Sequence, residues 1–181
     1  MTDHAEKLND SLLILRCQTG DEDSYRELVS RFGPRLAYFL RKLVADPDRA
    51  DDLVQEVWLN VLQQLPRLND AGAFTTWLYR IAHRKAMLDW RKNGRIPATT
   101  PDVELIAERE QVSFAPEDAA RIHVALDQLD PMQREVIVLR FLEELSYDEI
   151  SQVVECPVGT VRSRIYYAKA HLRRLLERRS N

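Results

Sequence analysis

Basic side chains are concentrated in two short stretches of this sequence, and both stretches could bind anions. Residues 157–181 contain seven arginines and lysines against one glutamate, and residues 74–95 contain six against one aspartate. The formal net charge of the whole chain is only −3, so the remainder is strongly acidic. Arginine and lysine pair with phosphate oxygens, and arginine also reads guanine edges. Two such islands therefore indicate two anion-binding surfaces.

The C-terminal island is predicted to lie on the second helix of a helix-turn-helix. Ser146 followed by Glu149 is a capping-box pattern, which predicts a first helix at 146–154, and a tight turn at 155–159 follows. The next apolar residues recur at intervals of four and three and predict its buried side: Val161, Ile165, Ala168, Leu172 and Leu175. A recognition helix presents its first residues to base edges in the major groove. The candidate contact residues are Thr160, Arg162, Ser163, Tyr166, Tyr167 and Lys169. A basic amphipathic helix in an ordinary bundle is the alternative.

The other island lies on a helix predicted near Thr75 to Lys92. At 100° per residue, Arg80, Arg84 and Arg91 fall within about 40° of one another, with His83 beside them. Four apolar residues are expected on the inward side: Trp77, Leu78, Ile81 and Leu88. Three further aromatic residues add surface near this helix: Phe74, Tyr79 and Trp90. Cations interleaved with aromatic rings suit single-stranded nucleic acid, although a tryptophan such as Trp77 is more often a core residue.

The sequence contains no arrangement of residues typical of catalysis. It has no glycine-rich phosphate loop, no histidine–cysteine cluster with metal spacing and no nucleophile elbow. We therefore expect a protein that is not an enzyme and that needs no metal or cofactor. Cys17 and Cys156 form no CxxC pair, which favours a reducing compartment. The N-terminus does not resemble a signal peptide, and no apolar run approaches about 20 residues. A cytoplasmic location without membrane insertion is expected.

Helical spacing of apolar residues extends over most of the chain, and strand-like alternation is absent. Asp46 followed by Pro47 predicts a helix start, and Pro66 predicts the end of that helix. Eight apolar residues between them predict one buried stripe: Ala50, Leu53, Val54, Val57, Trp58, Val61, Leu62 and Leu65. Before it, two helices are expected, separated at Gly33-Pro34.

The predicted fold is all-α and has two small helical domains. Residues 1–94 form the first domain, and residues 119–181 form the second, which contains the helix-turn-helix. The segment between them, 95–118, holds three prolines and six acidic residues against two arginines. Because like charges repel, this linker is expected to be extended. It is either a solvated tether or a segment that threads a basic channel of a partner.

Three segments, in this order and at these separations, resemble the extracytoplasmic-function (ECF) sigma factors of bacterial RNA polymerase. They are "DRADDLVQEVWLNVLQQL", "AFTTWLYRIAHRKAMLDWRK" and "LSYDEISQVVECPVGTVRSRIYYAKAHL". The resemblance covers nearly the whole chain apart from the linker and the termini. It implies two all-α domains, core RNA polymerase and promoter DNA as partners, and regulation by an anti-sigma factor. The implied function is promoter-specific transcription initiation.

The resemblance also assigns residues. It implies that Asp52, Gln55 and Glu56 dock on the clamp helices of the largest polymerase subunit, whereas by pattern alone these residues are a solvated face. It implies that the helix at 75–92 and the loop before it open the minus-ten element and capture a flipped base. The candidate residues there are Leu68, Asn69, Asp70, Trp77, Arg80, His83, Arg84 and Arg91. It implies that the helix-turn-helix binds the minus-thirty-five element as duplex.

The sequence departs from the family pattern at three positions. Arg84 stands where members often have Asn, and Tyr167 stands where many have Arg. Glu155 replaces the Gly or Asn that is common in the turn of a helix-turn-helix. Two other classes of protein remain as alternatives. One is a dimeric helix-turn-helix repressor that binds duplex operators without polymerase, and the other is an enzyme with a DNA-binding tail.

Overall fold

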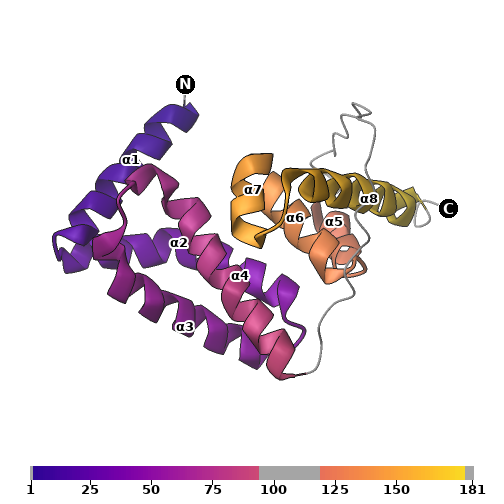
Figure 1. Cartoon of the computed structure of the whole chain (residues 1–181), viewed down its shortest axis with the longest axis horizontal. Coiled ribbons are helices and arrows are strands. Elements are labelled where there is room, and N and C mark those ends of the chain that lie inside the picture. Colours follow the sequence, from indigo (N-terminus) through magenta and orange to yellow (C-terminus); the bar gives the residue numbers. More distant parts are fainter. Residues whose placement is uncertain (1, 94–118, 178–181) are drawn as a thin grey trace. The chain divides into compact units, whose positions relative to one another are not determined.

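The computed structural model describes residues 2–93 and 119–177, with side chains from residues 8 and 121 onward (Figure 1). The chain divides into two compact units, residues 1–93 and 94–181. Within the described ranges all regular secondary structure is helical, which confirms the all-α prediction of two helical domains. The predicted linker, 95–118, lies outside the described residues, so its bounds stay predictions.

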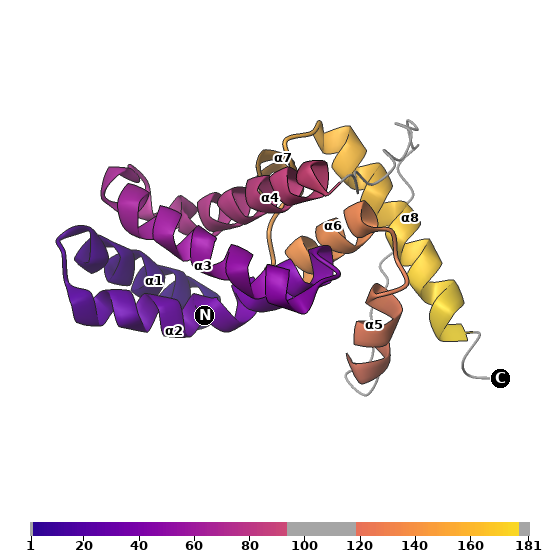
Figure 2. The same cartoon turned by 90° about the horizontal axis from the view of Figure 1, so that it is seen from below.

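The first unit contains four α-helices and two short 3₁₀ turns. The helices are α1 (Thr2–Gln18), α2 (Glu22–Leu43), α3 (Pro47–Gln64) and α4 (Phe74–Lys92). The 3₁₀ turns η1 (Leu65–Arg67) and η2 (Ala71–Ala73) lie between α3 and α4. Helices α2, α3 and α4 pack against one another, and α1 packs on α2 and on both turns (Figures 1 and 2). Edge-to-face aromatic pairs fill the centre, with ring centroids 5.1 Å apart for Phe32–Phe74 and 5.0 Å apart for Phe39–Tyr79.

Helix α2 continues through Pro34, so the predicted break at Gly33-Pro34 is wrong. A proline inside a helix removes one backbone hydrogen bond and costs about 3 kcal/mol. The cost is offset because one face of α2 is buried on both sides of Pro34. Leu28 and Phe32 precede the proline on this face and Leu36 and Phe39 follow it, and each is at most 1% exposed.

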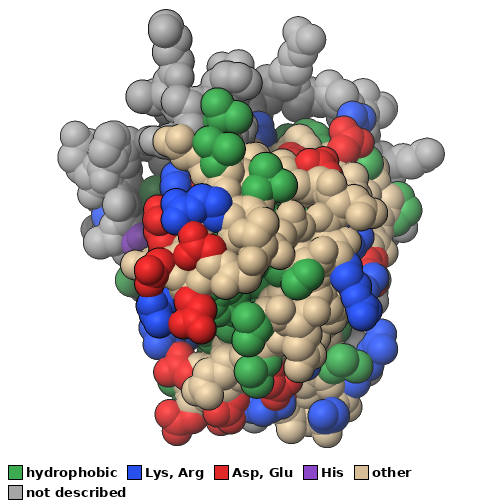
Figure 3. Space-filling model, turned by 90° about the vertical axis from the view of Figure 1, so that its left-hand side faces the viewer, with side chains coloured by type: hydrophobic (Ala, Val, Ile, Leu, Met, Phe, Trp, Pro, Cys, Tyr) green, Lys and Arg blue, Asp and Glu red, His purple; other side chains and the backbone are tan. Residues whose placement is uncertain are grey.

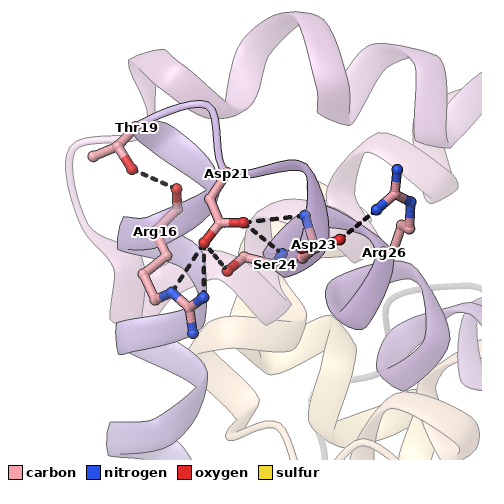
Figure 4. A network of polar contacts seen from close by, with 6 residues as sticks. All are labelled: Arg16, Thr19, Asp21, Asp23, Ser24 and Arg26. Carbon is pink, nitrogen blue, oxygen red and sulfur yellow. Dashed lines mark hydrogen bonds and ion pairs between the residues drawn. The ribbon is translucent and has the colours of Figure 1, made fainter.

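The junction between α1 and α2 is organised by Asp21 (Figure 4). Its carboxylate caps α2 by accepting from the backbone N–H groups of Asp23 and Ser24, both at 3.1 Å, and from Ser24 Oγ at 2.9 Å. Arg16 on α1 donates to the same carboxylate from Nε at 3.2 Å and from Nη2 at 2.7 Å. The backbone N–H of Ser24 and, after it, the Arg16 guanidinium lower the pKa of Asp21 to about 2.

This pKa predicts a loss of stability in acid. Because the pKa of Asp21 is lower in the folded chain than in the unfolded chain, its contribution is complete above about pH 4 and is lost as the pH falls toward 2. We expect Asp21→Asn, which still caps α2 but lacks the charge, to lose less melting temperature between pH 4 and pH 2 than the parent protein. Thermal denaturation followed by circular dichroism measures this difference. Parallel curves would show that Asp21 does not contribute.

The second unit contains α5 (Ala119–Leu126), α6 (Pro131–Phe141), α7 (Tyr147–Val154) and α8 (Val158–Glu177). Helices α5, α6 and α7 all pack against α8. Two predicted helix starts are confirmed. Asp130 caps α6 with Pro131 at its first position, and Ser146 and Glu149 form a reciprocal capping box at 3.2 and 2.8 Å.

The turn between α7 and α8 has a left-handed residue that is not glycine. Glu155 has φ 52° and ψ 43°, and its backbone N–H bonds the carbonyl of Ser151. The Ser151 hydroxyl donates to the carbonyl of Cys156 at 2.7 Å, which closes the turn from the α7 side. A side chain in this conformation costs about 1–2 kcal/mol, which explains why glycine or asparagine is usual at such a position.

Candidate nucleic-acid and partner interfaces

The outward face of α3 carries the three predicted docking residues. Asp52 and Gln55 are exposed, and the Glu56 side chain is 40% exposed. Two leucines extend the same face, since Leu59 is 59% and Leu62 54% exposed. At 100° per residue these five residues span about 120° of arc, opposite the buried side of α3. The face is therefore a mixed surface with acids, an amide and two leucines.

Leu62 was predicted on the buried stripe of this helix, and that prediction is wrong. The buried side is narrower than the stripe drawn from sequence and consists of Ala50, Leu53, Val57 and Val61. Val54 and Trp58 are half-buried. Leu59 was missed as a candidate because a single leucine outside an apolar stripe carries no signal. Only the width of the packed surface shows that both leucines remain exposed.

The acids of α3 are tied electrostatically to α4. Lys85 Nζ lies 3.0 Å from Glu56 Oε2. Arg49 donates from Nε to Asp89 at 2.5 Å, and its Nη1 lies 3.7 Å from Asp52 and 3.8 Å from Glu56. The hydrogen bond to Asp89 is the main reason why the pKa of Arg49 is raised. Lys85 belongs to the basic island at residues 74–95. In the free chain its side chain nevertheless faces α3.

Helix α4 buries a wide face and leaves a narrower basic one. Arg84 and Arg91 are exposed, and Arg80 is half-buried. Trp77 is also half-buried, and at 100° per residue it falls on the side of Arg80 and Arg84 rather than on the inward side. Its ring lies 5.9 Å from that of Phe74, which supports it from the core. Trp77 is therefore the aromatic residue of α4 that can accompany the arginines.

Several predictions for α4 are corrected by its burial. His83 is 6% exposed, so it does not lie on the surface beside the arginines. Leu88 was expected inward but is 50% exposed. Three aromatic residues expected to add surface are buried: Phe74, Tyr79 and Trp90. The physical reason is that α4 packs against both α2 and α3, which buries more than half of its circumference.

Asp70 organises the second half of the loop before α4. Asp70 caps η2, with its carboxylate accepting from Gly72 N–H at 2.8 Å and its carbonyl accepting from Ala73 N–H at 3.1 Å. Leu68 is half-buried, whereas Asn69 and Asp70 are exposed. Within the part of the chain that the structure describes, the Asn69 amide makes no hydrogen bond. Among the three predicted loop residues, Asn69 is thus the one whose polar group is available to a ligand.

Helix α8 presents a basic and aromatic surface on one side. Arg162 is exposed, Tyr166 is 39% exposed, and Tyr167 and Lys169 are half-buried. The rings of the two tyrosines meet edge to face, 5.5 Å apart. By helical spacing, Arg162, Tyr166 and Lys169 fall within about 60° of arc, and the exposed Arg173 lies on the same arc. Sequence reasoning omitted Arg173, although the i+4 spacing from Lys169 could have included it.

Thr160 and Ser163 do not face outward, contrary to prediction. They are 8% and 4% exposed, and the Ser163 hydroxyl donates to the carbonyl of Thr160 at 2.9 Å. Arg164, which also belongs to the basic island, is 7% exposed and is not part of the outward surface. These side chains are buried because three helices, α5, α6 and α7, pack against α8.

One face of the first unit carries side chains of several types. Figure 3 shows hydrophobic, acidic and basic side chains interspersed on the side that lies at left in Figure 1. Within the described residues no group of three or more histidines, cysteines or carboxylates could hold a metal ion. Nor does any described helix combine the length and apolar character needed to cross a bilayer.

Comparison with known families defines the class of protein. Residues 28–96 match Sigma-70 region 2, and residues 119–172 match Sigma-70, region 4. The chain is 33% identical over 181 residues to the RNA polymerase sigma-H factor of Pseudomonas aeruginosa, covering 93% of this chain and 94% of that one. It is also 33% identical over 179 residues to the ECF RNA polymerase sigma-E factor of Escherichia coli K12, covering 91% and 93%.

The chain therefore belongs to the Sigma-70 family of RNA polymerase sigma factors. Within this family it is an ECF sigma factor, which confirms the resemblance read from sequence. It binds core RNA polymerase and directs promoter-specific transcription initiation, and the repressor alternative finds no support.

Two solved structures share the fold. The structure of CnrH in complex with the cytosolic domain of CnrY has a TM-score of 0.65 and 27% identity, covering 93% of this chain and 97% of that one. The co-crystal structure of the sigma factor RpoE with the anti-sigma factor NepR from Bartonella quintana has a TM-score of 0.64 and 25% identity, covering 84% and 96%.

Proposed function

We propose that the two domains divide promoter recognition between them. Residues 1–94 dock on core polymerase and open the minus-ten element, residues 119–181 bind the minus-thirty-five element as duplex, and residues 95–118 connect them. In this proposal the chain is a specificity subunit of the polymerase and has no catalytic activity of its own. The observation that carries this division is the exposed arc of α4, where Trp77 accompanies Arg80 and Arg84. A duplex-binding domain alone would not need this second cation–aromatic surface.

The proposed polymerase-docking face is the outward side of α3. Its residues are Asp52, Gln55, Glu56, Leu59 and Leu62. Exposed leucines surrounded by polar groups are typical of the apolar centre and polar rim of a protein interface. The acids complement a basic partner, and Asp52, whose side chain is 64% exposed, is the most accessible of them.

The proposed minus-ten surface combines the loop at 68–72 with the exposed arc of α4. Asn69 offers its amide to the edge of an unpaired base, and Trp77 offers a ring on which a base can stack. Arg80, Arg84 and Arg91 supply cations for the strand backbone. The buried His83 takes no part in this contact.

The proposed minus-thirty-five surface is the outward arc of α8. Arg162, in the first turns of the helix, is placed to read a base, because recognition helices contact bases with their N-terminal residues. Tyr166 lies one turn further along the same side, Tyr167 flanks this arc with its ring against that of Tyr166, and Lys169 and Arg173 are suited to phosphates. Thr160 and Ser163 support the backbone of the helix instead.

We also propose that an anti-sigma factor regulates this chain. The support is the similarity to RpoE, whose structure contains the anti-sigma factor NepR. Transcription reconstituted from this protein and core polymerase on genomic DNA, with mapping of start sites, tests the proposed function. Start sites that share no sequence at minus ten or minus thirty-five would refute it.

Replacing Arg162 by alanine tests the assignment on α8. A bidentate arginine–base contact provides about 1–3 kcal/mol of discrimination. Transcription from a promoter with an intact upstream element should fall about tenfold, and transcription from a promoter with a scrambled upstream element should change little. Arg174→Ala is the matched control, since Arg174 is exposed on the same helix but by helical spacing points away from this arc. An equal loss on both promoters would show that Arg162 contacts only phosphate.

A further inference from the structure

A glutamine on α1 holds the backbone that leads into the loop at 68–72. Gln18 Nε2 donates to the carbonyl of Leu65 at 2.9 Å and to the carbonyl of Leu68 at 2.7 Å. One side-chain amide thus satisfies two backbone acceptors that lie 47 and 50 residues away in sequence. Leu68 N–H also donates to the Leu65 carbonyl at 3.0 Å, which closes η1 as a turn.

These two carbonyls lie where α3 ends and the loop begins. The last carbonyls of a helix have no partner within the helix and need an external donor. Leu65 follows the last residue of α3 and is 2% exposed, so its carbonyl has little access to water. Beside the Leu68 N–H, Gln18 gives this carbonyl a second donor, and at the same time it bonds the carbonyl of Leu68, the first residue of the loop. The direction in which the chain leaves Leu68 toward Asn69 is therefore fixed from α1.

Gln18 itself is held in place by the α1–α2 junction. It is the last residue of α1. The Thr19 hydroxyl donates to the carbonyl of Arg16 at 2.7 Å (Figure 4). Gly20 N–H donates to the carbonyl of Cys17 at 3.0 Å. The Arg16–Asp21 ion pair ties the same turn to the start of α2. These bonds fix the residues on both sides of Gln18 and tie the end of α1 to the start of α2.

We propose that Gln18 is a positioning residue for capture of the unpaired minus-ten base. The inference rests on the proposed function of the loop and assigns to Gln18 no contact with DNA. By fixing the backbone at Leu65 and Leu68, Gln18 holds Asn69 in place before the strand arrives. A loop that is already ordered loses less conformational freedom on binding, so the captured state is favoured.

The test compares three substitutions of Gln18 in holoenzyme assembled with core polymerase. Gln18→Leu removes the donors at similar size, Gln18→Glu replaces them by a carboxylate, and Gln18→Lys restores a donor. We expect Gln18→Leu and Gln18→Glu to weaken binding of a single-stranded minus-ten oligonucleotide at least about fivefold. Gln18→Lys should retain most of the binding affinity. Core affinity should stay within about twofold in all three. Gln64→Leu is the matched control, because Gln64 adjoins η1 but, among the described residues, its amide bonds only Asn60, at 3.3 Å.

Three results would overturn the inference, and the third would overturn the proposed function of the loop as well. The first is normal oligonucleotide binding by Gln18→Leu while Asn69→Ala weakens it, which leaves the proposed function intact. The second is a loss of oligonucleotide binding that parallels the loss of melting temperature across the three variants, or that is matched by an equal loss of core affinity. In either case Gln18 would contribute only to the stability of the fold. If Asn69→Ala and Arg84→Ala both bind normally, the proposed function of the loop has failed and the inference fails with it.

Discussion

Asp52→Lys combined with Leu59→Arg should reduce affinity for core polymerase at least about a hundredfold without unfolding the protein. Both side chains are exposed, so the change in stability should remain within about 0.5 kcal/mol. On a docked surface the same change removes apolar contact and places like charges together, which costs several kcal/mol. Fluorescence anisotropy with labelled protein and purified core polymerase measures the affinity, and circular dichroism measures the melting temperature.

Glu56 is left unchanged in this design because Lys85 lies 3.0 Å from its carboxylate. A lysine at position 56 would repel Lys85 and so disturb the packing of α3 on α4. The matched control is Leu15→Arg with Glu27→Lys, which makes the same change in charge at an exposed leucine and acid on α1 and α2. Core affinity should be unaffected in the control. Parent-like affinity of the Asp52/Leu59 variant would remove α3 from the interface.

Arg49→Ala is expected to destabilise the first unit by about 2–3 kcal/mol. Asp89 is 4% exposed, and without Arg49 its carboxylate keeps only the Asn93 amide, at 3.1 Å, as its remaining side-chain donor. A buried carboxylate that loses its cation pays its desolvation without compensation. The expected destabilisation is smaller than that for a fully buried ion pair because the Arg49 side chain is 32% exposed. Urea unfolding measures the free energy.

An exposed pair between neighbouring helices provides the control for Arg49. Arg41 on α2 donates to Asp51 on α3 at 2.8 Å, with both side chains more than half exposed. Arg41→Ala should therefore change the free energy of unfolding by no more than about 0.5–1 kcal/mol. The double replacement of Arg49 and Asp89 by leucine should recover part of the loss, because no charge is then left buried. Equal effects at Arg41 and Arg49 would contradict the burial argument.

Local signals in the sequence predicted the helices and their starts well. Ser146 with Glu149 and Asp130 with Pro131 are contacts between near neighbours, so residue types and spacing alone predict them. The same holds for the helical order of each unit and for the exposed Arg84 and Arg162. The break expected at Pro34 was wrong because packing on both sides of the proline outweighs its local cost.

Errors in the candidate sites have one physical origin. Periodicity gives the direction of the buried side of a helix but not its width, which depends on how many neighbours the helix has. Helix α4 packs on two helices and buries His83, α8 packs on three and buries Thr160 and Ser163, and α3 buries a narrow side and leaves Leu62 exposed. The bonds from Gln18 and Lys85 to other segments depend on tertiary packing, which a single sequence does not reveal.

If α3 docks on polymerase and α4 binds the minus-ten strand as proposed, the Lys85–Glu56 ion pair couples the two contacts thermodynamically. In the free chain the Lys85 ammonium is neutralised internally, so it displaces no counterion from DNA. When a cationic side chain of polymerase pairs with the Glu56 carboxylate, Lys85 loses its partner and becomes an additional positive charge on α4. Because linkage is reciprocal, each contact then strengthens the other by the same factor. The logarithmic salt dependence of single-strand binding would be steeper by about 0.7 in the assembled complex than in the free subunit.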